Sequence, residues 1–334
     1  MWPPDTSRWP RVLVTGAGGP AAIAVIRALQ AAGVRVAAAD ADPTATGLFL
    51  VPAEHRHVIP LASDPRLTDE VLSACRRSRA TVLLPTVDAE LVPLARRSDE
   101  IRRAGVDPML PTASALEAAL DKATLATVPM PGVRVPATSV LDADAAARFE
   151  YPAIVKPRHG SGSRGVVTVD GAEEARSLAE SRGDLLIQEL LPGSEYTVDV
   201  LVSRAGELLG AVPRERLRID SGVAVAARVR KSPELEVAAG AVMRSLGLTG
   251  LCNVQFKESP SGEPSLLEVN PRPAGTLPLT IAAGIDMPLM ALADALGESV
   301  QPAPHYEEVA MVRFLENVVI GIEELHSARG EVTA

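Results

Sequence analysis

Short apolar runs alternate with helical segments through the first 110 residues, and this alternation restricts the fold more than any other feature. The runs 11–15 and 81–85 are apolar almost throughout, without a polar residue at every second position. Strands of this kind, separated by helices, are typical of a parallel sheet covered on both faces. We therefore predict a doubly wound α/β unit with strands at 11–15, 34–40, 56–60 and 81–85 and helices at 21–32 and 67–78.

A proline-rich stretch at 129–136 ends this pattern, and the strands that follow are spaced more closely. Segments 196–203 and 208–212 are separated by a short turn, and segments 252–257 and 265–270 by a short polar loop. Connections this short join antiparallel strands. The remainder of the chain is therefore predicted to be α+β.

The composition excludes several classes of protein. A net charge of −9 and an aromatic content of 3% argue against a nucleic-acid-binding surface, which is normally basic and often carries stacking aromatic residues. The apolar stretch 277–296 is interrupted by Asp286, Pro288 and Asp294, so no membrane span is expected. We also expect no signal peptide, and two isolated cysteines fit a reducing compartment, so the predicted location is the cytoplasm.

A glycine-rich turn follows the first predicted strand. Residues 16–21 read GAGGPA, which matches the G-x-G-x-x-G/A pattern of dinucleotide-binding turns, and Asp40 ends the next strand where an acid contacts the ribose of NAD. One interpretation is an NAD(P)-dependent oxidoreductase. Because any strand-to-helix turn of this kind favours glycine, we prefer the interpretation of a structural turn.

The last predicted hairpin carries polar residues on one face. Glu268 and Asn270 lie two positions apart on a strand and therefore point the same way, and Gln255 across the hairpin is a candidate for the same side. Carboxylate and amide oxygens suit Mg²⁺. Arg272 follows between two prolines, where a guanidinium can clamp a phosphoryl group or an acyl phosphate. The alternative is a half-exposed hairpin with a polar side.

Two lysines and a flexible loop precede this hairpin. Lys156 ends an apolar strand at 153–156, and the loop 160–165 that follows reads GSGSRG. Backbone N–H groups and hydroxyls of such a loop can fold over phosphates, and a plain turn between strands is the alternative. Lys122 supplies a further cation, and the bend at 188–195 leaves backbone groups that can contact the edge of an adenine.

Taken in order, these segments resemble the ATP-grasp superfamily. The matching motifs are DK at 121–122, IVKP at 154–157, GSGSRG at 160–165, QELLPGSEYTVDV at 188–200, NVQF at 253–256 and EVNPR at 268–272. The sequence is most similar to the branch of the carbamoyl-phosphate synthetase large chain and related carboxylate–amine ligases. The resemblance implies a Rossmann-like N-terminal domain at 1–110, linker helices and a small lobe with a glycine-rich lid at 111–190, and a C-terminal lobe with the metal site at 191–325.

The resemblance also implies a role for each motif. The residues implied to bind ATP are Lys122, Lys156, Ser161, Gly162, Ser163, Glu189, Leu190, Leu191 and Glu195. The lysines would hold phosphates, the lid would close over them, the bend would contact adenine through its backbone, and Glu195 would contact the ribose. Gln255, Glu268 and Asn270 are implied to bind one or two Mg²⁺ ions, with Mn²⁺ as an alternative, and Arg272 to steady the transferred phosphate. Many relatives have an acid where this chain has Gln255, and the amide lowers the charge of the site.

The implied reaction is ligation through an acyl phosphate. A carboxylate attacks the γ-phosphate of ATP, and an amine then displaces phosphate, so that ADP and phosphate are released. The predicted partners are a small carboxylic acid and an amine or amino acid, and a homodimer remains open. A kinase of a small carboxylate, similar to carbamoyl-phosphate synthetase, is an alternative.

A cationic segment at 212–231 stands out in this acidic chain. A solvated strand face is one interpretation, and a site for the substrate carboxylate or the transferred phosphate at Arg214, Arg228 or Arg230 is the other. Arg228 and Arg230 alternate with apolar residues and therefore share a face. We predict that these two arginines take part in catalysis.

Overall fold

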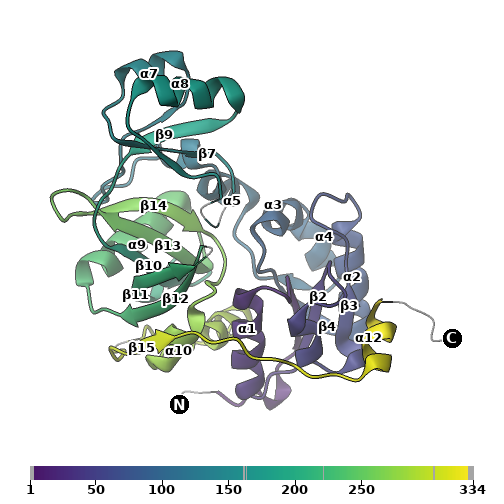
Figure 1. The fold of residues 1–334 in the computed structure, drawn as a ribbon. Coiled ribbons are helices and arrows are strands. Elements are labelled where there is room, and N and C mark those ends of the chain that lie inside the picture. The colour runs from purple at the N-terminus through teal and green to yellow at the C-terminus, as the bar shows by residue number, and fades with distance from the viewer. Residues whose placement is uncertain (1–3, 161, 163, 221, 304, 330–334) are drawn as a thin grey trace.

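The structure, a computed structural model, describes residues 4–160, 162, 164–220, 222–303 and 305–329. The described chain forms three β-sheets, of five, four and six strands. In Figure 1 the five-stranded sheet lies beside the six-stranded one, and the four-stranded sheet lies above the latter. The predicted combination of an α/β unit with α+β units is confirmed.

The N-terminal sheet is parallel, with the strand order β3-β2-β1-β4-β5. Its strands are β1 (Arg11–Thr15), β2 (Val36–Asp40), β3 (Arg56–Val58), β4 (Ala80–Leu84) and β5 (Asp107–Pro108), and its helices are α1 (Pro20–Ala31), α2 (Leu67–Ser78), α3 (Asp88–Arg96) and α4 (Ser98–Arg103). Val12, Leu13 and Val14 of β1 are fully buried, because α1 and α2 pack on the sheet. This arrangement confirms the doubly wound unit expected from the continuous apolar runs.

The four-stranded sheet, which we call the small lobe together with its helices, is antiparallel and has the order β6-β9-β7-β8. Helices α5 (Ala113–Leu120) and α6 (Lys122–Leu125) lead into it. It contains β6 (Thr138–Val140), α7 (Ala143–Arg148), β7 (Ala153–Pro157), β8 (Val167–Val169), α8 (Ala172–Ser181) and β9 (Leu185–Glu189). Val155, Val169 and Ile187 belong to a core that this lobe forms by itself.

The six-stranded sheet, which forms the large lobe, is antiparallel with the order β14-β13-β10-β11-β12-β15. It contains β10 (Glu195–Val202), β11 (Leu208–Asp220), β12 (Val223–Val229), α9 (Pro233–Leu246), β13 (Gly250–Glu258), β14 (Pro264–Asn270), α10 (Leu277–Ala282), α11 (Met287–Ala295) and β15 (Ala310–Val312). The sequence predicted that the second of these strands ends at residue 212. It continues to Asp220 because it pairs with β12 after it has paired with β10.

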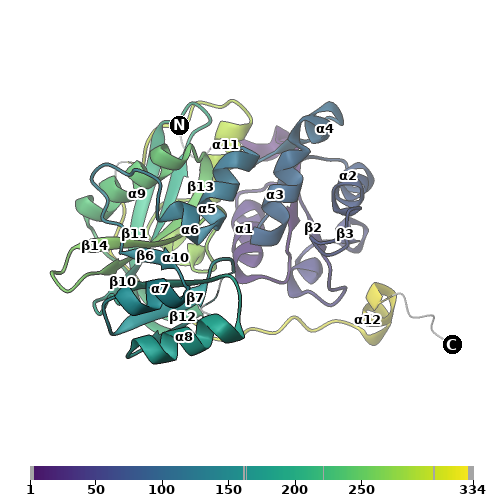
Figure 2. The ribbon, with the colours of Figure 1, turned by 90° about the horizontal axis from the view of Figure 1, so that it is seen from above.

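The N-terminal unit and the large lobe share one hydrophobic core. Ile26 and Leu29 of α1 lie in the same cluster of buried residues as Leu277 and Leu292, because α1 packs against α10 and α11. After β15 the chain returns along the N-terminal unit to α12 (Ile322–Arg329), as Figures 1 and 2 show. No helix among the described residues is long and apolar enough to cross a bilayer.

Candidate functional site

A cavity of about 630 Å³, which we call the cleft, opens between the small lobe, the large lobe and the N-terminal unit. The described residues that the sequence predicted to bind ATP or the metal line it together with Arg272, whereas Arg214, Arg228 and Arg230 do not. These lining residues are Lys122, Lys156, Gly162, Glu189, Leu190, Leu191, Glu195, Gln255, Glu268, Asn270 and Arg272. Ser161 and Ser163 lie outside the described residues. The structure thus brings residues more than 100 positions apart in the sequence to one site.

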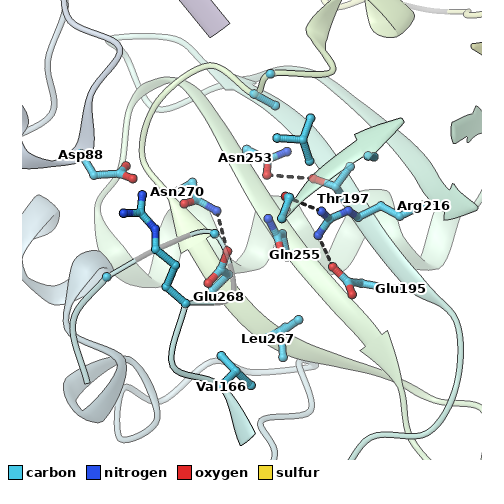
Figure 3. A pocket seen from close by; sticks show the side chains of 18 of the residues that line it. Asp88, Val166, Glu195, Thr197, Arg216, Asn253, Gln255, Leu267, Glu268 and Asn270 are labelled. Atoms are coloured by element: carbon cyan, nitrogen blue, oxygen red, sulfur yellow. Dashed lines mark hydrogen bonds and ion pairs between the residues drawn. The ribbon is translucent and has the colours of Figure 1, made fainter. Parts of the chain in front are cut away.

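The hairpin of β13 and β14 positions the oxygen ligands. Gln255 pairs directly with Glu268, and Asn253 with Asn270, so these four side chains point to the same side of the sheet. Asn270 donates a hydrogen bond of 3.1 Å from Nδ2 to Oε1 of Glu268. Figure 3 shows Gln255, Glu268 and Asn270 close together in the cleft.

This donor set fits Mg²⁺ or Mn²⁺, since it offers only oxygens: one carboxylate and two amides. The described residues contain no group of three His, Cys, Asp or Glu side chains arranged to hold a metal ion. A cation in the cleft would therefore depend on the amides of Gln255 and Asn270 and on bound phosphate oxygens. Glu268 is the only carboxylate of the set.

Arg272 is held from the N-terminal unit. Its Nε donates to Oδ1 of Asp88 at 2.8 Å, and its Nη2 donates to Oδ2 at 2.9 Å. Asp88 is the first residue of α3, and both side chains line the cleft. Such a bidentate pair fixes the plane of the guanidinium. The reactive end of the cleft is thus built jointly by two parts of the chain.

The two lysines come from the linker and the small lobe. Lys156 is the penultimate residue of β7, is buried, and donates from Nζ to Oε1 of Gln188 at 2.7 Å. Burial lowers the pKa of Lys156 to about 8, although the charge of Glu268 opposes this shift. Lys122 donates from Nζ to the carbonyl oxygen of Gly160 at 2.5 Å and so ties the linker to the lid.

The bend after β9 is already engaged by arginines. Glu189 accepts a hydrogen bond of 2.6 Å from Nη2 of Arg134 at Oε1, and its backbone N–H donates to the carbonyl oxygen of Ala137 at 2.9 Å. Glu195 forms an ion pair with Arg216, which also donates to the carbonyl oxygen of Gly222 at 2.8 Å (Figure 3). A ribose at Glu195 would therefore meet Arg216 as well, a contact that the sequence did not predict.

Arg228 and Arg230 do not reach the cleft. Arg228 pairs with Glu215 across β11 and β12, and Glu215 pairs with Tyr196 across β10. Arg228 is on the same face as Glu215, because directly paired residues share a face of the sheet. Arg216 follows Glu215 in β11 and therefore points to the opposite face, which lines the cleft. Arg228 instead forms an ion pair of 2.7 Å with Glu215, and Arg230 is exposed beyond the end of β12. The sequence showed that the two share a face, and the structure places that face outside the cleft.

Arg214, the third candidate, is fully buried beneath the cleft. It forms an ion pair with Asp199 and donates to Oγ1 of Thr276. Asp199 also accepts from Oγ1 of Thr280 at 2.6 Å and from Nδ2 of Asn253 at 3.1 Å. Thr276 and Asn253 line the cleft, so this buried network holds part of its floor. Asp88, Gln188 and Arg216 also line the cleft, although the sequence assigned no role to any of these three side chains.

The N-terminal glycine turn has no free N–H groups between residues 17 and 19. Ala17 donates to the carbonyl oxygen of Ala39 at 3.1 Å, Gly18 to Oδ2 of Asp40 at 2.8 Å, and Gly19 to the carbonyl oxygen of Gly16 at 2.9 Å. The short 3₁₀ helix η2 (Thr46–Leu50) covers the turn, and a Cβ on Gly47 would lie 2.1 Å from the carbonyl oxygen of Ala17. The geometry supports the structural turn over a pyrophosphate-binding site.

A doubly wound unit followed by a small and a large antiparallel lobe, with lysines facing oxygen ligands across a cleft, defines a nucleotide-binding fold of two lobes. A family model described as "ATP-grasp in the biosynthetic pathway with Ter operon" matches residues 181–318. A second model, "PylC-like, N-terminal domain", matches residues 12–109. The two matches support the ATP-grasp superfamily.

Relatives of known name lie in several branches. The D-alanine–D-alanine ligase of Anaeromyxobacter sp. (strain Fw109-5) is 31% identical over 156 residues, which are 42% of this chain and 51% of the ligase. The formate-dependent phosphoribosylglycinamide formyltransferase of Variovorax paradoxus (strain S110) is 26% identical over 302 residues, 81% of this chain and 72% of the relative. This chain thus spans about half the length of the D-alanine–D-alanine ligase that it matches.

Solved structures agree on the fold. The biotin carboxylase domain of the Hydrogenobacter thermophilus 2-oxoglutarate carboxylase, in complex with MgADP, ADP and bicarbonate, superposes with a TM-score of 0.72. The sequences are 19% identical, and the match covers 89% of this chain and 72% of that one.

Proposed function

We propose that this protein is an ATP-dependent carboxylate–amine ligase that works through an acyl phosphate and releases ADP and phosphate. One observation carries the proposal: the cleft sets two lysines from the linker and small lobe opposite Glu268, Asn270 and Arg272 of the large lobe. Lysines on one side, with oxygen ligands and an arginine on the other, suit a polyphosphate with a divalent cation bound beside it. The named ligases among its relatives support the same class of reaction.

The lysines bind and orient the nucleotide in this proposal. Lys156 and Lys122 neutralise phosphate oxygens, and the backbone around Leu191 contacts the adenine. Mg²⁺ held by Gln255, Glu268 and Asn270 would supply charge neutralisation at the phosphates. Closure of the two lobes excludes water, which would otherwise hydrolyse the acyl phosphate.

Arg272 positions the second half of the chemistry. Its guanidinium lies beside the oxygen ligands and is oriented by Asp88. In that place it binds the carboxylate reactant and stabilises the charge that develops on the transferred phosphoryl group. The substrates proposed here are a small carboxylic acid and an amine or amino acid.

The test is a screen for ADP release in the presence of ATP, Mg²⁺ and pairs of acids and amines drawn from the amino acids and simple carboxylic acids. Hydroxylamine serves as a small neutral nucleophile that converts any acyl phosphate into a hydroxamate. We expect hydroxamate formation that requires a carboxylate, and faster ADP release when a matching amine is added. Absence of hydroxamate with every acid would overturn the ligase.

Two other functions give different results in the same screen. A kinase of a small carboxylate would release ADP at an undiminished rate without an amine. An oxidoreductase would bind NADH or NADPH tightly and hydrolyse no ATP. The oxidoreductase is the weaker candidate, because the backbone N–H groups of residues 17–19 already form hydrogen bonds within the protein.

A further inference from the structure

The loop between β14 and α10, residues 271–276, forms one wall of the cleft. Four of its residues line the cleft: Arg272, Ala274, Gly275 and Thr276. Arg272 is the proposed contact with the carboxylate and the transferred phosphoryl group. The loop backbone lies outside the regular hydrogen bonds of the strand before it and the helix after it. The position of Arg272 therefore depends on what holds the loop from outside.

Two contacts from other parts of the chain hold the ends of this loop. Asp88 of the N-terminal unit accepts two hydrogen bonds from Arg272, at 2.8 and 2.9 Å. Arg214, which is buried beneath the cleft, donates to Oγ1 of Thr276. Both contacts are made through side chains at the ends of the loop. The backbone in its middle, at Gly275, is held in a different way.

The middle of the loop is held by residues 310–329, which we call the strap. The strap consists of β15, a connecting run and α12, and it passes from the large lobe along the N-terminal unit (Figures 1 and 2). Arg313 follows β15 and donates from Nη2 to the carbonyl oxygen of Gly275 at 2.5 Å. Its backbone N–H donates to the carbonyl oxygen of Val225 at 2.8 Å. Arg313 thus joins the edge of the large sheet to the wall of the cleft.

Gly275 is also packed closely on its other side. A Cβ at this position would lie 3.0 Å from Cγ of Pro20, the first residue of α1. Contacts this short leave the loop little room to shift toward α1. Gly275 is therefore fixed by Arg313 at its carbonyl oxygen and by Pro20 at its α-carbon.

The charge of Arg313 is committed to the loop. In the described part of the chain Arg313 forms no ion pair with a carboxylate, whereas the strap residues Glu316 and Glu324 pair with Arg27 and Arg56 at 2.7 and 2.5 Å. Partial burial lowers the pKa of Arg313, but a guanidinium stays charged at neutral pH. A hydrogen bond from a charged donor is about twice as strong as one between neutral groups. The contact with the loop is therefore a strong one.

We infer that Arg313 is a positioning residue for the ligation: through Gly275 it holds the loop in the place where Arg272 faces the oxygen ligands. This inference rests on the proposed ligase function and adds to it a residue that does not line the cleft. Lys122 and Lys156, which bind the nucleotide in that proposal, belong to other elements. Loss of the Arg313 contact should therefore weaken the step that involves the carboxylate and leave nucleotide binding intact.

The test compares three variants of the strap. Arg313→Met removes the donor and the charge but keeps a long side chain, and Arg313→Lys keeps a charged donor. Glu316→Gln is the matched control, because it removes a different contact of the strap, the exposed ion pair with Arg27, and leaves Gly275 untouched. Two quantities are measured for each: kcat/KM of the best carboxylate from the hydroxamate screen at saturating ATP, and the affinity for ADP with Mg²⁺ by equilibrium titration.

The two measurements should separate in Arg313→Met. We expect its kcat/KM for the carboxylate to fall by about tenfold or more, as for the loss of one hydrogen bond from a charged group. Its affinity for ADP should stay within about twofold of wild type, because the lysines are unaffected. Arg313→Lys should recover most of the loss. Glu316→Gln should change both quantities by less than about twofold.

The outcomes distinguish this inference from the ligase proposal. If wild type forms hydroxamate and Arg313→Met matches it, the ligase stands and the positioning role is wrong. The role is also wrong if ADP affinity falls in parallel with the rate, if Arg313→Lys is no better than Arg313→Met, or if Glu316→Gln loses as much. If wild type forms no hydroxamate with any acid, the ligase itself is overturned, and the positioning role with it.

Discussion

Both faces of the six-stranded sheet carry arginine and glutamate side chains, but the two faces have different roles. On the cleft face, Thr197, Gln255 and Glu268 lie in one row across β10, β13 and β14. On the other face, Tyr196 and Phe256 pack toward α9, and Arg228 lies at the margin with Glu215. Successive side chains along each strand thus point alternately into the cleft and into the hydrophobic core. The comparison of the two faces shows that the role of a side chain depends less on its residue type than on the face of the sheet to which it points.

The largest effect is expected from the buried part of the cleft face. Arg214→Leu leaves the charge of Asp199 buried without its cation, which should lower the free energy of unfolding by about 3–5 kcal/mol. Urea denaturation measures the loss. The double variant Arg214→Leu/Asp199→Asn removes the charge as well and should recover a large part of it. A single-variant loss below about 1 kcal/mol would contradict the importance of this ion pair.

The next effect is expected on catalysis at the same face. Glu268→Gln removes the only carboxylate of the metal set and should lower ADP release by about 10²–10³-fold, because charge at the phosphates is no longer balanced. The melting temperature should stay close to that of wild type, since Glu268 is only partly buried. Retention of more than about a tenth of the activity would show that the metal is held elsewhere.

A smaller effect is expected on the KM for ATP from Lys156 of the small lobe. Because the pKa of Lys156 is lowered to about 8, its ammonium form is lost as the pH rises through that value. The KM for ATP should be constant below about pH 7 and rise by up to about tenfold per pH unit well above pH 8. Lys156→Arg keeps its charge over this range and should abolish the rise. A flat profile for wild type would contradict the shift.

The smallest effect is expected on the outer face. Arg228→Ala and Arg230→Ala should change kcat and KM by less than about twofold, because both side chains are exposed and Arg228 is paired with Glu215. Steady-state kinetics of both variants provide the measurement. A large loss of activity in either variant would support the prediction from the sequence that these arginines take part in catalysis. The reactants would then have to bind outside the cleft.

The sequence predicted the parts of the site that are local. Glu268 and Asn270 share a face because they lie two positions apart on β14, whereas the pairing of Gln255 with Glu268 depends on a register shift beside Gln255 that the loop length does not give. The order of motifs also placed Lys122 and Lys156 in the same cleft. These features can be recognised from residues that lie close together in the sequence.

Features that depend on tertiary packing could not be predicted. Alternation along β12 showed that Arg228 and Arg230 share a face, but the side of the sheet depends on where α9 packs. The partnership of Arg272 with Asp88 joins residues 184 positions apart, and no local signal marks it. The pairing of Glu195 with Arg216 likewise follows from the extension of β11 beyond residue 212.

The separate core of the small lobe has a consequence for unfolding. Ile187 and its neighbours form a hydrophobic core that is separate from the larger core. The small lobe can therefore unfold as a cooperative unit of its own. A nucleotide bound by Lys156 and Glu268 would link that unit to the rest of the chain. Calorimetry of the free protein should then show two overlapping heat-absorption peaks, which merge into one at saturating ATP.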